Sequence, residues 1–179
     1  MASTNKTPNY NLPQWVATDK PQMADFNTAM ADIDTNINLV SVRPACKVGK
    51  TATQSIANNT ELMVSFNRED FDSHNMHSNT VENQKIVIPQ TGIYSVLLNI
   101  GFVVNTNGIR TLSIYVNGVI LQSKNFVAFN DYMLLSLSAI VKLNAGVYIH
   151  ATVRQTSGSS INVVAESHAT TFSAVKISD

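Results

Sequence analysis

Side chains that can bind metal ions cluster between residues 70 and 77. This segment reads Asp70-Phe-Asp72-Ser-His74-Asn-Met-His77. Alternate residues of an extended chain lie on one side, so Asp70, Asp72 and His74 could together hold a divalent ion through carboxylate and imidazole ligands. A solvated loop without metal is the alternative, and the sequence indicates no other cofactor.

A second candidate site is the aromatic segment of residues 125–132, which is predicted to be an irregular connection because Asn and Asp lie between its rings. Its candidate ligand-binding residues combine three rings with an amide and a carboxylate: Phe126, Phe129, Asn130, Asp131 and Tyr132. Such a mixture can hold a sugar, because rings pack against its C–H faces while amides and carboxylates bind its hydroxyls. The rings could instead fill the interior of the domain or the axis of an oligomer.

Motifs of catalysis are incomplete in this chain. Val48-Gly49-Lys50-Thr51 imitates the end of a phosphate-binding loop, but that loop needs a glycine where this chain has Pro44. The sequence contains no Gly-x-Ser-x-Gly and no His-Glu-x-x-His. Its acidic residues after residue 45 are scattered, whereas glycoside cleavage needs two carboxyls that face each other. We therefore expect a protein that is not an enzyme.

Charge and composition narrow the classes of partner. The 179 residues contain 12 Lys and Arg against 12 Asp and Glu, and only 13% of them are charged. No basic run is present, so neither nucleic acid nor an anionic membrane is an expected partner. No run approaches the roughly 20 apolar residues of a membrane span, and the start lacks the apolar core of a signal peptide. Cys46 is the single cysteine, so stability must come from packing and assembly.

Residues 1–22 are predicted to form an extended arm. They contain three of the five prolines, and proline fixes φ and removes a backbone donor. The apolar residues between the prolines are Tyr10, Leu12 and Trp15. We expect these side chains to dock on a partner, and folding back onto the segment that follows is the alternative.

Residues 23–44 are predicted to form a helical stem. Apolar residues recur at steps of three and four, in Met23, Phe26, Met30, Ile33, Ile37 and Val40. This is a heptad pattern, and isoleucine at both core positions favours three strands. A single helix of this length is marginal in water, which predicts a trimeric coiled coil. An amphipathic helix lying on the following domain is the alternative.

Residues 45–179 show the alternation of β-strands. Apolar residues alternate with others from Tyr94 to Val104, and Asn117-Gly118 is a strong hairpin signal. About eight short strands without an intervening helix predict a mainly β, antiparallel sandwich, and their number is typical of a jelly roll. Several strands, including the one that carries Leu97, are apolar on both faces, which indicates contact between subunits.

Four motifs of this region, in this order, resemble the complement-head and tumour-necrosis-factor-like (TNF-like) jelly-roll family. They are Pro89-Gln-Thr-Gly-Ile-Tyr94, Leu112-Ser-Ile-Tyr-Val-Asn-Gly118, Leu143-Asn-Ala-Gly-Val147 and Thr171-Phe-Ser-Ala174. Members of this family are trimers with apolar faces between their subunits, so the resemblance implies a homotrimer. Val147 and Ala174 replace the family's Asp and Gly, which puts a family-type calcium site in doubt.

The N-terminus resembles the opening of phage tail and baseplate appendage proteins and receptor-binding proteins. The matching residues are Tyr10-Asn-Leu-Pro-Gln-Trp15, Asp19-Lys-Pro21, Asp25-Phe-Asn27 and Ile33-Asp-Thr-Asn-Ile37. In that group an aromatic arm attaches to the particle and a helical bundle carries a β head.

This second resemblance implies a protein of the virion, in its tail or baseplate, that is made in the cytoplasm of a bacterial host. Its expected partners are other virion proteins and a host cell-wall saccharide or another surface receptor. Three copies would present several weak sites at once and so gain affinity. A decoration protein with no ligand of its own and a polysaccharide depolymerase are the alternatives.

Overall fold

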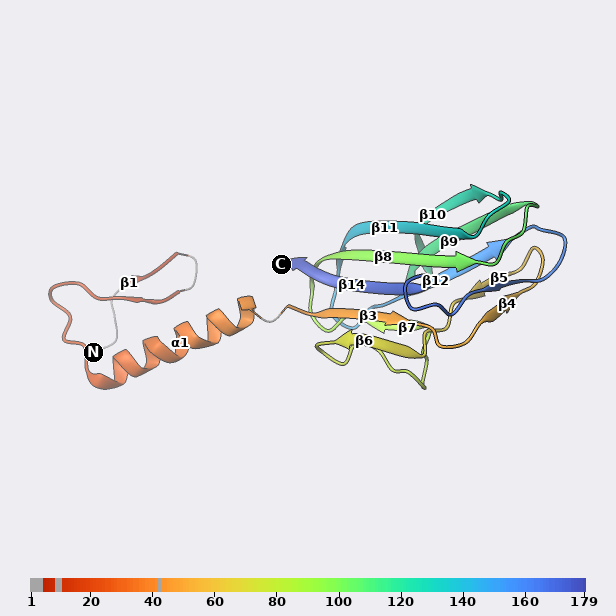
Figure 1. Cartoon of the computed structure of the whole chain (residues 1–179). Helices are drawn as coiled ribbons and strands as arrows, with labels where there is room; N and C mark the ends of the chain where they lie inside the picture. Colours follow the sequence, from red (N-terminus) through yellow and green to blue (C-terminus); the bar gives the residue numbers. More distant parts are fainter. Residues whose placement is uncertain (1–4, 9–10, 42) are drawn as a thin grey trace. The chain divides into compact units, whose positions relative to one another are not determined.

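The computed structural model describes every residue except 1–4, 9–10 and 42 (Figure 1). The chain forms two compact units, residues 1–43 and residues 44–179. We name the first the N-terminal unit and the second the head. No helix among the described residues is long and apolar enough to cross a membrane.

The arm of the N-terminal unit is a hairpin and not an extended segment. Two short antiparallel strands, β1 (Asn5–Lys6) and β2 (Pro13–Gln14), pair with each other. The chain reverses because Asn11 takes a φ of +57°, a conformation that Asn tolerates well. The backbone N–H of Leu12 also donates to the Thr7 hydroxyl at 2.9 Å. Proline stiffness predicted the extended arm, and this turn overrides it.

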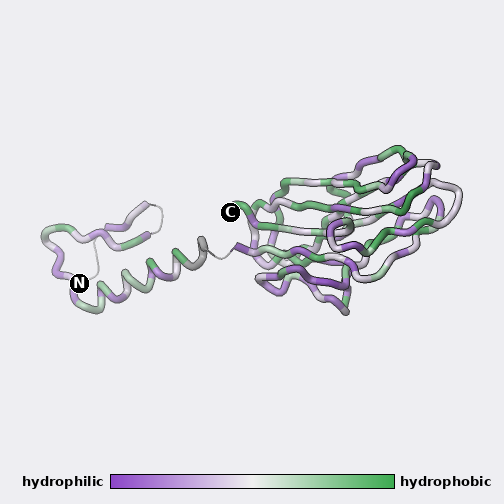
Figure 2. The backbone as a smooth tube through the Cα atoms, viewed as in Figure 1, coloured by the Kyte–Doolittle hydropathy of each residue, from purple (hydrophilic) through white to green (hydrophobic). Residues whose placement is uncertain are grey.

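The helix α1 (Met23–Ser41) begins at a capping interaction. The backbone N–H of Gln22 donates to Asp25 Oδ2 at 2.8 Å, which satisfies a donor at the helix start. Hydrophilic and hydrophobic segments alternate along the helix (Figure 2). Met23, Met30 and Ile37, seven residues apart, are 74%, 58% and 62% exposed. The helix thus leaves a stripe with a heptad period without cover in the single chain.

The arm contacts its own helix. The ring centroids of Trp15 and Phe26 lie 5.0 Å apart, and Ala29 on the same helix is buried. Leu12 is partly buried, and Ile33 is partly buried as well. Tyr10 and the side chain of Val40 lie outside the described residues. In the single chain, folding back onto the helix is therefore the arrangement observed for the aromatic arm.

One sheet of the head has seven strands. Along its main path they are β4 (Gln54–Ile56), β13 (Ile161–Val163), β8 (Gly92–Phe102), β14 (Thr171–Ser178), β3 (Ala45–Gly49) and β6 (Arg68–Asp72). The remaining strand, β11 (Met133–Leu143), pairs with β8 over the whole length of both. All of these pairs are antiparallel.

The other sheet of the head has five strands. They are β10 (Val119–Val127), β9 (Ile109–Val116), β12 (Tyr148–Gln155) and β5 (Glu61–Met63), with β7 (Lys85–Val87) paired to β12 beside β5. The β9–β10 hairpin turns at Asn117 and Gly118, whose φ values are +46° and +80°. These angles fit the type I′ turn that the Asn-Gly pair predicts.

The two sheets enclose one hydrophobic core (Figure 1). Alternation places the even-numbered residues of β8 inside, and Phe66 stacks on Phe172 with ring centroids 5.6 Å apart. Fully buried members from both sheets include Tyr94, Val96, Leu98, Ile100, Phe102, Leu112, Ile114, Ile149, Ala151 and Phe172. The prediction of a mainly β, antiparallel sandwich is confirmed.

Candidate functional site

The proposed metal ligands Asp70, Asp72 and His74 have other partners. The Asp70 carboxylate pairs with Lys47 at 3.2 Å and with Arg68 at 2.8 Å. The Asp72 carboxylate accepts the backbone N–H of His74 at 3.1 Å and the backbone N–H of His77 at 2.9 Å. Within the part of the chain that the structure describes, no three His, Cys, Asp or Glu side chains form a group that could hold a metal ion.

The same region contains a long loop that its own polar contacts hold in place. Residues 73–84 connect β6 to β7 without regular strands. The buried imidazole of His77 lies between Glu69 Oε1 at 3.1 Å and the carbonyl oxygen of Asn83 at 3.2 Å. The backbone N–H of Val87 donates to the carbonyl of Met76 at 2.7 Å. We name residues 73–84 the β6–β7 loop.

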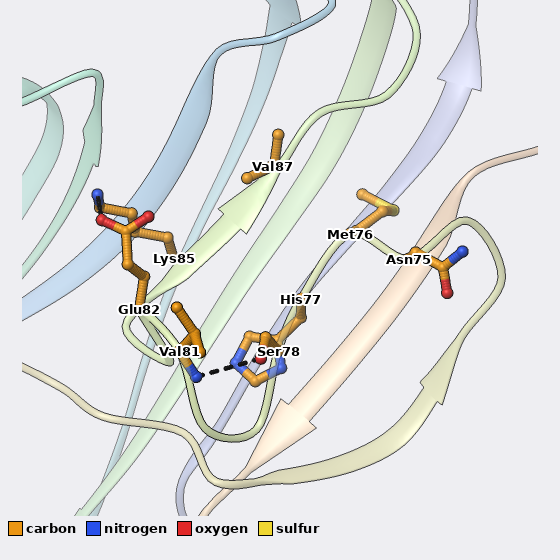
Figure 3. Close-up of a pocket in the computed structure, with 8 residues that line it drawn as sticks. All are labelled: Asn75, Met76, His77, Ser78, Val81, Glu82, Lys85 and Val87. Carbon is orange, nitrogen blue, oxygen red and sulfur yellow. Dashed lines mark hydrogen bonds and ion pairs between the residues drawn. The ribbon is translucent and has the colours of Figure 1, made fainter.

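This loop and β7 surround a pocket of about 170 Å³ (Figure 3). We name it the β7 pocket, and its lining residues are Asn75, Met76, His77, Ser78, Val81, Glu82, Lys85 and Val87. Val81 and Val87 are 69% and 45% exposed, which gives the pocket an apolar part that faces solvent. The Lys85 ammonium pairs with the Glu82 carboxylate, and this bond raises the pKa of Lys85.

A cluster of rings adjoins the pocket on the outer face of the five-stranded sheet. Lys85 Nζ lies 4.6 Å from the centre of the Tyr148 ring. His150 is stacked between Tyr148 at 5.7 Å and Tyr115 at 4.9 Å. Burial lowers the pKa of His150, and the nearby charge of Lys85 lowers it further. The Tyr115 hydroxyl donates to Glu61 at 2.7 Å, which fixes the position of the Tyr115 ring.

The aromatic candidates are divided between a strand and a loop. Phe126 belongs to β10 and packs against the core. Phe129 is 52% exposed, and the exposed Asn130 and Asp131 follow it. The Tyr132 hydroxyl donates to Glu166 at 3.3 Å. No two of these three rings stack on each other, so the structure does not assemble them into one aromatic surface.

Lys50 is a buried cationic side chain of the head, as is Arg110, which is 0% exposed. Lys50 is 2% exposed, and its ammonium donates to the carbonyl oxygen of Ser65 at 2.6 Å and to Gln54 Oε1 at 2.9 Å. Both acceptors are uncharged, and burial lowers the pKa of Lys50 to about 8. β3 ends at Gly49 and β4 begins at Gln54, with no helix between them, so these residues lack the geometry of a phosphate-binding loop.

The outward side of the seven-stranded sheet has an uncharged area, beside which the outward-facing Lys47 of β3 and Lys142 of β11 lie. We name this area the β8 face, formed by Ile93, Ser95, Leu97, Asn99, Leu134, Ser136, Ser138, Ile140, Ser173 and Val175, which alternate with core residues on β8, β11 and β14. Leu97, Leu134 and Ile140 are 39%, 55% and 74% exposed. The Ser136 hydroxyl donates to Asn99 Oδ1 at 2.6 Å, and the Asn99 amide N–H donates to the Thr171 hydroxyl at 3.1 Å.

Comparison with solved structures identifies the architecture of the head. Murine APRIL in a crystal structure at pH 5.0 aligns with a TM-score of 0.59 and 15% identity over 76% of this chain and 100% of that one. This chain has a TNF-like jelly-roll fold. The Eiger TNF from S. frugiperda aligns at a TM-score of 0.57 and 11% identity, over 76% of this chain and 94% of that one.

The TNF-like fold confirms the resemblance that the four sequence motifs indicate for the head. A further structure of murine APRIL, at pH 8.5, aligns at a TM-score of 0.57 and 14% identity over 76% of this chain and 100% of that one. No protein-family model matches the chain, and no curated protein matches it. The fold is compatible with a homotrimer.

The β7 pocket was missed by reasoning from the sequence. Two of its lining residues, Glu82 and Lys85, are ordinary surface residues by type and form an ion pair across one turn of the chain. One signal was available. Val81 is an apolar residue in a polar segment of twelve residues, and loops of that length inside a compact domain often carry function.

Proposed function

We propose that this chain is a non-enzymatic, homotrimeric attachment protein of a phage tail or baseplate. The N-terminal unit joins other virion proteins, and the head binds a receptor on the surface of the host cell. The observation that carries the proposal is the β8 face. Its ten residues include no charged side chain, and Lys47 and Lys142 lie beside it, paired with Ser173 and Ile93. Leu97 and Ile140 are exposed on this face.

Such a face favours association with an identical one. A sheet face that meets only water usually carries charged and polar side chains, and large apolar patches on a single chain mark interaction sites. The TNF-like fold supports three copies, because the family that the head resembles is trimeric through apolar faces. The exposed heptad stripe of Met23, Met30 and Ile37 supports a trimeric stem in the N-terminal unit.

The location in a virion rests on the resemblance of residues 10–37 to phage appendage proteins. A particle-decorating protein without a ligand would use the same trimer, and binding to host cells separates the two. Antibodies against the head should label purified phage particles and block their adsorption to host cells. Labelling without any effect on adsorption would favour the decorating protein.

Sedimentation equilibrium of the full chain tests the trimer directly. At micromolar concentration we expect the mass of three chains of 19.5 kDa each. The double variant Leu97→Asp/Ile140→Asp should dissociate, since it buries charge in the β8 face. Val127→Asp is the matched control, because Val127 is 77% exposed on β10 of the other sheet. A wild-type protein that sediments as a single chain would refute the proposal.

A further inference from the structure

The β6–β7 loop is long and has a fixed conformation. Its twelve residues carry no regular strand, yet contacts at several points hold them in place. His77 joins the loop to Glu69 of β6, and Asp72 at the end of β6 accepts two backbone N–H groups of the loop. The backbone N–H of Phe66 donates to the carbonyl of Asn83 at 2.9 Å. A long loop with one conformation is suited to ligand binding.

Glu82 in this loop adopts a backbone conformation that is unfavourable for its residue type. Its φ is +49°, a region in which glycine and asparagine are common and glutamate is rare. Such a conformation persists where the surrounding contacts impose it, and it often accompanies a functional site. Here it directs the carboxylate of Glu82 to Lys85 at the mouth of the β7 pocket (Figure 3).

We propose that the β7 pocket binds one neutral sugar residue of the host saccharide. This inference rests on the proposed function, to which it adds the site and the class of ligand. Val81 and Val87 contact an apolar face of the sugar ring, and the charged pair Glu82–Lys85 binds its hydroxyls. The Tyr148 ring, next to Lys85, extends the surface toward a second sugar residue.

The size and charge of the pocket fit this ligand. Its volume of about 170 Å³ is comparable to that of one hexose. The carboxylate and the ammonium balance each other, so the pocket attracts neither anions nor cations. A hydroxyl donates to one group and accepts from the other, and sugar rings present several hydroxyls beside an apolar face.

The pocket stays open in the proposed trimer. It is built by the β6–β7 loop and by β7 of the five-stranded sheet. None of its lining residues belongs to the β8 face, through which the copies associate. The three identical pockets of one trimer would then bind a repeating polysaccharide together.

Saturation-transfer NMR on the full-length trimer tests this site. The probes are glucose, galactose, rhamnose and N-acetylglucosamine, each at millimolar concentration. We expect signal transfer to at least one of them, and at least a tenfold loss of affinity in Val81→Ser. Val127→Ser is the matched control, since Val127 is 77% exposed against 69% for Val81 and lies on the opposite edge strand β10.

Glu82→Gly provides a second variant that does not depend on damage to the fold. Glycine accepts a positive φ without steric strain, which offsets its greater freedom in the unfolded chain, so the midpoint of urea denaturation should stay close to that of the wild type while sugar affinity falls at least tenfold. Binding that survives in both pocket variants would overturn the inference, and so would the absence of transfer from all four sugars. Sedimentation of the same samples reports on the trimer separately. Sugar binding by a single chain would therefore refute the proposed function and leave the site standing.

Discussion

The buried ammonium of Lys50 predicts an unusual dependence of stability on pH. In the unfolded chain this lysine has a pKa of 10.5, and burial in the head lowers the pKa to about 8. Between these values the unfolded state binds more protons than the folded state, so stability rises with pH. The difference of about 2.5 pH units corresponds to at most about 3 kcal/mol over the whole window, at about 1.4 kcal/mol per unit.

The accessible part of this window lies between pH 7.5 and pH 9.5. Over that range Lys50 contributes a gain of about 2 kcal/mol in the free energy of unfolding. The Cys46 thiol, whose pKa burial raises to about 12, offsets about 1 kcal/mol of it, so the expected net gain is about 1 kcal/mol. Urea denaturation at three pH values across it, at one fixed protein concentration, measures the gain. Fixed concentration matters because association of the chains also contributes to stability. Measurements stop below pH 10, since burial raises the pKa of Tyr94 and the hydrogen bond to Glu61 raises the pKa of Tyr115, so both tyrosines add a pH dependence of their own there.

The variant Lys50→Met should remove this gain, so that stability falls slightly from pH 7.5 to pH 9.5 because of the Cys46 thiol. The substitution deletes the titrating group and leaves a side chain of similar length in the same site. Lys124→Met is the control, because Lys124 is exposed on β10, and it should keep the gain of the wild-type protein. A wild-type stability that stays flat or falls from pH 7.5 to pH 9.5 would contradict the buried, uncharged surroundings of Lys50.

Three further predictions concern the core and the turns of the head. Burial, with the charges of Asp72 and Glu69, raises the pKa of the Cys46 thiol to about 12, so iodoacetamide at pH 8 should modify it only in urea. Modification of the native protein would show that the thiol is accessible. Phe172→Ala should cost about 3–5 kcal/mol in urea denaturation, because the ring is fully buried against Phe66; a loss below about 1 kcal/mol would contradict this packing. Gly108→Ala should destabilise more than Gly146→Ala, although both have a positive φ of +76° and +84°. A Cβ at Gly108 would lie 2.0 Å from the carbonyl oxygen of Thr156, whereas one at Gly146 meets nothing within 4 Å; equal losses would refute the close contact.

The strands of the head could be predicted because their alternation is a local property. From Tyr94 onward, every second residue of β8 is buried, and the Asn117-Gly118 pair turns the hairpin that it predicts. Phe126 shows the limit of this reasoning. Polar neighbours in the sequence indicated an irregular connection, but pairing with Arg110 of β9 makes it part of a strand.

The candidate site could not be predicted, because its contacts join residues that are distant along the chain or ordinary in type. Glu69 and His77 come from a strand and a loop, and their contact depends on how the loop folds back. Sequence alternation placed Asp70, Asp72 and His74 together as ligands, but ion pairs and backbone donors occupy the first two. These competing partners become visible only when β3 lies beside β6.

The first and last strands of the head lie side by side. Val175 of β14 pairs with Ala45 of β3, and the backbone N–H of Lys176 donates to the carbonyl of Pro44 at 2.9 Å. The chain therefore enters and leaves the head at one place, an arrangement that tolerates exchange of whole domains. A different head could therefore be joined behind the same N-terminal unit without altering the connection.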